Sequence, residues 1–175
     1  MGRIPPALRP LRRFIGTPRV AKHRLFVWLP RGTLPDSQVI VVARDDDFAF
    51  GVLHSRPHEV WSLRMDSFLG VGNDPRYTPS TTFETFPFPR PVADARGAVS
   101  AASRALAEAR DRALAGGDTL TKLYNRRPAW LARLHEDLDR AVHAAYGWPH
   151  PLPDEEVLKR LLALNLERAA RSHGP

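Results

Sequence analysis

Residues 128–147, which read PAWLARLHEDLDRAVHAAYG, decide the fold class. Apolar side chains recur there at the three–four spacing of an amphipathic helix. The expected inward stripe consists of Trp130, Leu134, Leu138, Ala141 and Ala145. Proline is favoured at the start of a helix and glycine just past its end, so the stretch predicts a helix that opens at Pro128 and stops at Gly147.

Two more amphipathic stretches flank this one. The preceding stretch places Val99, Ala102, Leu106, Ala109 and Ala113 on one face and ends at Gly116-Gly117. The following stretch opens with three acids at 154–156 and closes near Arg168 and Arg171, which complement the two ends of a helix dipole. Its expected inward residues are Val157, Leu158, Leu161, Leu162 and Asn165. Residues 92–175 therefore predict a three-helix bundle or a helical cap.

Strand character is confined to the first 45 residues. Residues 19–29 (RVAKHRLFVWL) alternate and become apolar toward their end, and residues 38–43 (QVIVVA) read as a buried strand. Two strands do not form a stable sheet alone, so residues 1–45 are expected to end a larger β-structure. The predicted fold class is α+β, mainly α.

Residues 46–91 predict a connector of helices and a loop. Asp45, Asp46 and Asp47 suit the N-terminus of a helix over 48–54, and Pro57 should separate it from a short helix over 58–65. Residues 70–89 hold four prolines and predict an ordered loop, whose later part is 76–89 (RYTPSTTFETFPFP). An arginine, a tyrosine and hydroxyl groups on such a loop could grip phosphates or base edges. The alternative is that its aromatic rings pack the loop against the helices.

The charge is concentrated at one end of the chain. Of a formal net charge of +7, residues 1–31 supply eight basic side chains and no acid, whereas the remaining residues hold 18 bases and 19 acids. Such a segment suits a polyanion, since each phosphate that it neutralises releases counterions. A merely solvated basic tail is the alternative. No cysteine and no apolar run of about 20 residues occur, so we expect a soluble cytoplasmic protein without disulfides.

No catalytic motif emerges. The aspartates at 45–47 could ligate a divalent cation and His54 and His58 could reach a zinc ion, but helix capping and the intervening Pro57 favour structural roles. Gly70-Val-Gly72 lacks the third glycine of a dinucleotide loop, and no nucleophile elbow or P-loop is present. We therefore expect no catalysis, no metal and no cofactor from this chain alone.

Six blocks carry a resemblance to a known family. They are residues 17–24 (TPRVAKHR), 50–61 (FGVLHSRPHEVW), 76–89, 120–130 (LTKLYNRRPAW), 138–148 (LDRAVHAAYGW) and 154–168 (DEEVLKRLLALNLER). In this order they resemble the C-terminal region of MmeI-like site-specific adenine DNA methyltransferases, which belong to single-chain type II restriction–modification systems. The resemblance implies that residues 1–45 end a target-recognition domain, 46–91 connect, and 92–175 form the C-terminal helical domain.

The family's S-adenosylmethionine-binding catalytic domain has no counterpart here, so the resemblance implies a truncated product or a methyltransferase domain on another chain. It also implies double-stranded DNA as the partner, with no membrane involved. The expected DNA-facing residues are Arg13, Arg19, Lys22, His23, Arg24, Arg76, Tyr77 and Thr78. Two alternatives are a module that docks on a separate methyltransferase subunit without touching DNA, and a metal-dependent nuclease that uses the aspartates and histidines.

Overall fold

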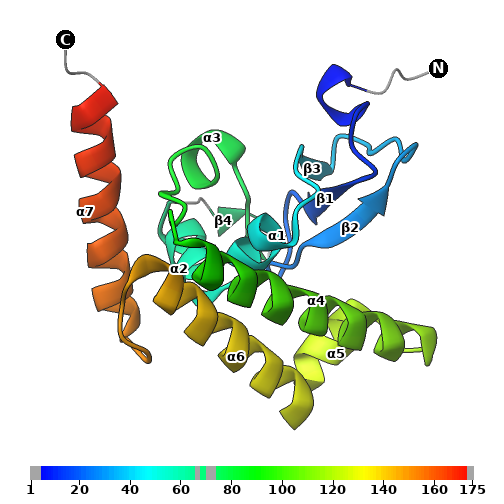
Figure 1. Ribbon diagram of the computed structural model, residues 1–175. Helices are drawn as coiled ribbons and strands as arrows, with labels where there is room; N and C mark the ends of the chain where they lie inside the picture. Colours follow the sequence, from blue (N-terminus) through cyan, green and yellow to red (C-terminus); the bar gives the residue numbers. More distant parts are fainter. Residues whose placement is uncertain (1–4, 66–67, 70–73, 173–175) are drawn as a thin grey trace.

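The computed structural model describes residues 5–65, 68–69 and 74–172, and its fold is α+β and mainly α, as predicted (Figure 1). A 3-10 turn, η1, spans Pro6–Leu8. The strands are β1 (Arg13–Pro18), β2 (Val27–Pro30), β3 (Val39–Val42), β4 (Phe68–Leu69) and β5 (Asp74–Pro75). The helices are α1 (Asp47–His54), α2 (Arg56–Met65), α3 (Pro79–Thr82), α4 (Ala93–Ala115), α5 (Leu120–Arg126), α6 (Ala129–Tyr146) and α7 (Asp154–Ser172).

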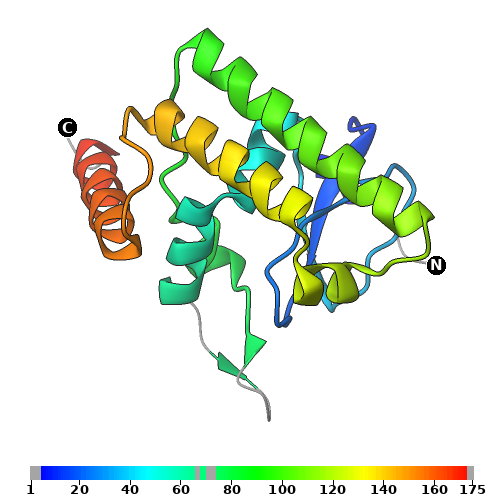
Figure 2. The same ribbon diagram turned by 90° about the horizontal axis from the view of Figure 1, so that it is seen from below.

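The three C-terminal helices form a cap rather than a bundle. Helices α4 and α6 run antiparallel side by side, joined by the short α5, and both pack on α1 (Figure 2). Helix α7 packs instead on α2, at the flank of the molecule opposite β1, β2 and β3 (Figure 1). The proposed helix stops are confirmed, since Gly116 caps α4 and Gly147 ends α6 in the left-handed conformation.

The inward stripes of α6 and α7 differ in part from the predicted ones. In α6 the buried residues are Leu131, Leu138, Val142, His143 and Ala145, whereas Trp130 is 39% exposed. In α7 Val157 and Leu161 are buried, but Leu162 is 44% exposed. Each helix lies against a narrow partner surface, so an apolar residue one position from the contact line faces outward. The inward placement of Trp130 and Leu162 is therefore wrong.

The sheet contains a strand that the sequence pattern did not indicate. β1 lies at its centre, and β2 and β3 pair with it antiparallel on either side. The strand expected over 19–29 is wrong for most of its length, because only β2 pairs with β1 there. Residues 19–22 instead bond to the later loop, where Tyr77 N donates to Arg19 O and Ala21 N donates to Pro75 O. The strand expected over 38–43 is confirmed as β3.

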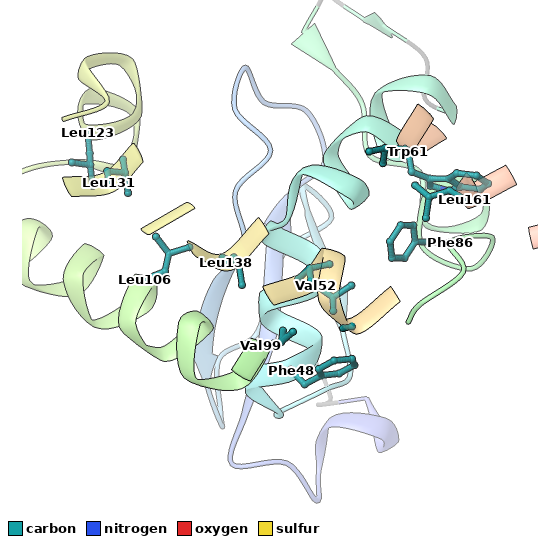
Figure 3. Close-up of a cluster of buried hydrophobic side chains, with 13 residues drawn as sticks. Phe48, Val52, Trp61, Phe86, Val99, Leu106, Leu123, Leu131, Leu138 and Leu161 are labelled. Carbon is teal, nitrogen blue, oxygen red and sulfur yellow. The ribbon is translucent and has the colours of Figure 1, made fainter. Parts of the chain in front are cut away.

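Two apolar clusters share α1, whose residues 48–54 are all buried. On one side Phe48 and Val52 join residues of α2, α4, α5, α6 and α7 in the larger cluster (Figure 3). On the other side Ala49, Phe50 and Leu53 pack against the sheet and Tyr77. A helix that is apolar all round belongs in the interior, so the sheet and the helical layer are built on the two faces of one central helix.

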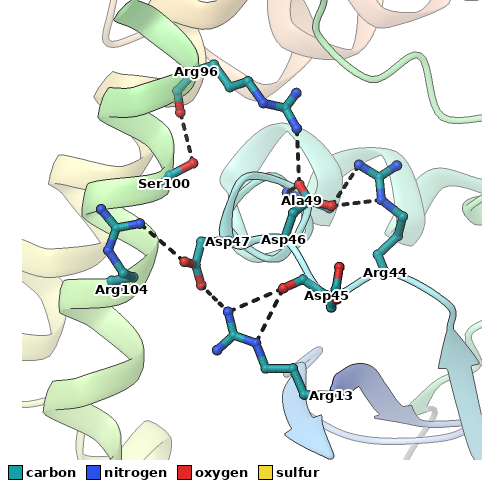
Figure 4. A network of polar contacts seen from close by, with 9 residues as sticks. All are labelled: Arg13, Arg44, Asp45, Asp46, Asp47, Ala49, Arg96, Ser100 and Arg104. Carbon is teal, nitrogen blue, oxygen red and sulfur yellow. Dashed lines mark hydrogen bonds and ion pairs between the residues drawn. The ribbon is translucent and has the colours of Figure 1, made fainter. Parts of the chain in front are cut away.

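The aspartates at 45–47 fix the start of α1. The Asp46 carboxylate accepts a hydrogen bond from Ala49 N at 2.9 Å, which confirms the predicted cap. Asp46 also forms ion pairs with Arg44 and Arg96, and Asp47 forms them with Arg13 and Arg104 (Figure 4). These contacts tie α1 to β1 and to α4, so the acidic triplet is part of the framework.

Candidate nucleic-acid interface

Two segments that the sequence separates by about 50 residues lie together in space. Val20 and Arg76 form an isolated antiparallel bridge, and Tyr77 N donates to Arg19 O at 2.7 Å. The basic segment 19–24 and the loop at 76–78 are therefore neighbours. We call the five basic residues that these neighbouring segments carry, Arg19, Lys22, His23, Arg24 and Arg76, the basic cluster.

Arg24 holds the basic cluster together. Its guanidinium donates to Thr17 Oγ1 at 3.2 Å, to Pro18 O, and to Pro75 O at 2.9 Å. It also lies 5.0 Å from the centre of the Tyr77 ring, where a cation is attracted by the aromatic face. These contacts join the end of β1 to β5, so Arg24 shapes the surface as well as charging it.

Lys22 and His23 are held by a residue of α5. The Lys22 ammonium donates to Asn125 Oδ1 at 3.1 Å, and His23 Nε2 donates to the same oxygen at 2.8 Å. Arg19 Nε donates to Ser37 O at 3.0 Å. Amide and carbonyl oxygens carry no net charge, and in the described part of the chain neither Arg19 nor Lys22 forms an ion pair. Both cations therefore keep their full charge for an external anion.

Arg13 does not join the basic cluster. It lies at the opposite end of β1, where it pairs with Asp47 at 2.7 Å and stacks 3.7 Å from the centre of the Trp28 ring. Its Nε and Nη2 also donate to Asp45 O. The carboxylate offsets its charge, so Arg13 stabilises the junction of β1 with α1.

The residues of the loop at 76–78 differ in burial. Tyr77 is fully buried and its hydroxyl donates to His58 Nε2 at 3.0 Å, so the prediction that its side chain approaches DNA is wrong. Thr78 is half-buried, and its carbonyl accepts from Thr81 N and Thr82 N at the start of α3. Arg76 is half-buried, and its Nε has no hydrogen-bond partner among the described residues. The packing alternative therefore holds for the tyrosine.

A polar cleft of about 400 Å³ adjoins the basic cluster. It lies between the 23–25 segment and helices α1, α2, α5 and α6. Its lining residues are His23, Arg24, Leu25, Leu53, His54, Arg56, Glu59, Tyr124, Arg127, His135 and Asp139. Arg127 ends α5 with a φ of 41°, an uncommon conformation for a residue with a side chain.

Burial determines the protonation states of two histidine side chains and one aspartate side chain that line the cleft. Desolvation lowers the pKa of His54 well below its ordinary value and lowers that of His135 to about 4, with nearby arginines adding to both shifts. Burial also raises the pKa of Asp139 to about 6. The buried histidines are therefore neutral near pH 7. Arg56 pairs with Glu59 and Asp154, so the positive charge of the cleft comes from Arg24 and Arg127.

Helix α5 and the residue that caps it supply three residues that the sequence patterns did not single out. Asn125 anchors Lys22 and His23, and Tyr124 and Arg127 line the cleft. The Tyr124 hydroxyl and His135 Nε2 share a hydrogen bond of 2.8 Å. These residues lie in the 120–130 block that carries the family resemblance, and that block was the one signal in the sequence that pointed to them.

The described residues hold neither a group placed to bind a metal ion nor a helix that could span a membrane. No group of three or more His, Asp or Glu side chains there is placed to hold a metal ion. His54 instead donates from Nδ1 to Phe50 O and accepts at Nε2 from Arg110 and from Phe26 N. None of the described helices combines the length and the apolar character that a membrane crossing requires.

Comparison with known proteins adds a structural relative. No family model and no curated protein matches the sequence. The fold is similar to part of the type IIL restriction-modification enzyme MmeI, whose structure was solved in complex with DNA, with a TM-score of 0.79 and 21% sequence identity. The similarity covers 90% of this chain but 21% of that one, so the present chain spans about a fifth of its relative's length. At this identity the match establishes a shared fold.

Proposed function

We propose that this chain binds duplex DNA as the recognition and C-terminal helical part of a site-specific adenine DNA methyltransferase of a restriction–modification system. In this proposal the S-adenosylmethionine-binding domain is supplied outside these 175 residues, by a separate chain or a longer parent protein. The chain itself performs no chemical step, and it acts in the cytoplasm.

The observation that carries the proposal is the convergence of the two segments in the basic cluster. The Val20–Arg76 bridge brings the two segments together, and His23 and Arg24 line the polar cleft. The side-chain bonds of Arg19 and Lys22 go to neutral oxygens. Such groups contact backbone phosphates without regard to sequence and fix the register of a protein on the duplex. The fold shared with a part of MmeI, whose structure was solved in complex with DNA, supports the same assignment.

The proposed mechanism is positioning. An enzyme that modifies adenine must extrude the base from the stack, and the surrounding duplex has to be held while this happens. The basic cluster would hold the phosphates, and Arg24 and Asn125 would keep its cations in place. Helices α4 and α6 would brace the cluster through α1 and α5.

Charge reversal tests the DNA contact. We expect Arg19→Glu and Lys22→Glu each to weaken the binding of a duplex of about 30 base pairs by tenfold or more, because each change repels a phosphate that the native cation attracts. Lys159→Glu is the matched control, since it makes the same charge change on α7, away from the strands. Fluorescence anisotropy measures all four proteins. Equal affinities for the two cluster variants and the control contradict the proposal.

The missing catalytic domain is tested separately. Calorimetric titration of the chain with S-adenosylmethionine should give no binding heat, and the chain alone should transfer no methyl group to DNA. Methylation should appear when a methyltransferase domain that binds this chain is added. Binding of S-adenosylmethionine to the isolated chain would overturn this part of the proposal.

A further inference from the structure

A second surface, distinct from the basic cluster, lies at the end of the α4–α6 hairpin near α5. It is a groove of about 510 Å³ between the last turns of α4 and the first turns of α6. Its lining residues are Ala109, Arg112, Ala113, Trp130, Arg133 and Leu134. We call it the Trp130 groove. The small side chains of α4 create the hollow, and Trp130 forms one wall while remaining 39% exposed.

The chemistry of the groove favours insertion of aliphatic side chains. Its lining is largely apolar, from two alanines, a leucine and the indole ring. A large exposed aromatic ring beside an apolar hollow is typical of a protein-binding hot spot, where Trp and Arg are enriched. A nucleic-acid stacking platform needs an aromatic face open to a base, whereas here the hollow lies between two parallel ridges of helical side chains.

Two cations flank the groove and define the charge of its occupant. The Arg133 side chain is 85% exposed, and its contact with Asp137 has an N–O distance of 4.0 Å, the outer limit of an ion pair. Arg112 is exposed, and no carboxylate within the described ranges pairs with it. An apolar floor between Arg112 and the loosely paired Arg133 is complementary to apolar residues with carboxylates on either side.

We propose that the Trp130 groove binds an acidic amphipathic helix of another protein, whose apolar side chains enter between α4 and α6 while its carboxylates pair with Arg112 and Arg133. This is the helix-in-groove mode, in which anchors at i, i+3, i+4 and i+7 fill a hollow between helices. The surface is separate from the basic cluster, so the proposal stands or falls independently of DNA binding.

The test uses a pair of synthetic peptides and the full chain. Each labelled helical peptide of about 14 residues carries leucines at i, i+3, i+4 and i+7, flanked by glutamates in one peptide and by lysines in the other. We expect the glutamate peptide to bind at least tenfold more tightly than the lysine peptide in fluorescence anisotropy. Trp130→Ala should weaken the glutamate peptide by about tenfold or more. Arg64→Glu, an exposed change on α2, should leave its affinity unchanged.

A charge swap keeps the test independent of folding defects. Arg133→Glu should weaken the glutamate peptide and strengthen the lysine peptide, a gain that an unfolded protein cannot show. Absent binding of the glutamate peptide, or equal affinity for both peptides, overturns the proposal. So does Trp130-dependent self-association in sedimentation velocity, which would assign the groove to a second copy. Trp130-dependent binding of a single-stranded thymidine oligomer overturns it as well, in favour of nucleic acid.

Discussion

At the scale of single residues, buried histidines connect the layers of this protein. His54 on α1 accepts from Arg110 Nη1 of α4 at 2.7 Å and from Phe26 N beside β2 at 3.1 Å. His58 on α2 donates from Nδ1 to Leu53 O and accepts from the Tyr77 hydroxyl. In each case the bonds require the neutral ring, because one nitrogen must remain an acceptor. These hydrogen bonds are therefore satisfied only when His54 and His58 are neutral.

Stability should consequently fall in acid. Burial lowers the pKa of His58 from 6.5 to about 3, so between these values the unfolded chain binds a proton that the folded chain does not. The free energy of unfolding should decrease as the pH falls below 6.5, by up to about 1.4 kcal/mol per pH unit from this residue. Asp139 acts in the opposite sense between pH 3.8 and about 6, since burial raises its folded pKa.

Urea unfolding between pH 4 and 7.5 measures this effect. His58→Gln removes the titrating ring, so its unfolding free energy should vary less steeply with pH than that of the wild type over the whole acid range. Only the slope is compared, which allows for a constant loss of stability in the variant. Parallel profiles for the two proteins would show that His58 does not carry the dependence.

Asn125 provides a residue-scale test of the DNA surface. Asn125→Asp places a carboxylate against Lys22 and His23, where it offsets positive charge while preserving the shape of the contact. Asn125→Ala removes the contact but leaves the cations unpaired. We expect the Asp variant to bind duplex DNA roughly fivefold more weakly than the Ala variant in low salt. Filter binding compares them, and the reverse order would exclude Lys22 and His23 as phosphate contacts.

At the scale of elements, α1 determines how closely the helical layer approaches. Gly51 faces α4 and α6, and an added Cβ there would meet Ser103 Cβ at 3.0 Å, Val99 Cγ1 at 3.1 Å and Leu138 Cδ1 at 3.2 Å. The absence of a side chain thus allows three helices to touch. Any larger residue must push two of them away, because the interior is close-packed.

Two glycine substitutions separate this packing effect from helix propensity. Gly51→Ala should destabilise the protein by about 1–3 kcal/mol, since the methyl group overpacks the junction. Gly97→Ala in α4 is the control, because nothing lies within 4 Å of its added Cβ. It should stabilise by about 0.5–1 kcal/mol through helix propensity. Thermal denaturation measures both, and a stabilising Gly51→Ala would refute the close contact.

The elements also show which features the sequence could reveal. Helices α4, α6 and α7 follow from local periodicity and end signals, and α1 follows from its aspartate cap. The sequence pattern did not predict strand β1, because its residues do not alternate between apolar and polar. Its stability comes from pairing with β2 and β3 on both sides. Residues 19–22 alternate yet bond to the loop near Tyr77, a partner that local patterns cannot indicate. Local patterns could not indicate the role of Asn125 either, because its contacts with Lys22 and His23 span about 100 residues.

At the scale of the whole molecule, α1 separates a small sheet from a helical layer, and α5 lies where the two meet. The basic cluster and the polar cleft lie on the sheet side of this junction, and the Trp130 groove lies at the end of the helical hairpin. Among the described residues, neither surface contains a group of three His, Asp or Glu side chains placed to hold a metal ion. In our proposals the first surface takes DNA and the second takes an acidic helix.

The salt dependence of duplex affinity tests the central claim most directly. Each phosphate that the chain neutralises should contribute about −0.9 to the slope of log affinity against log salt concentration. We expect a clearly negative slope for the wild type, a slope flatter by about one for Lys22→Ala, and an unchanged slope for Lys159→Ala. A wild-type slope near zero, or the same slope in all three proteins, would contradict the claim that the basic cluster faces the DNA backbone.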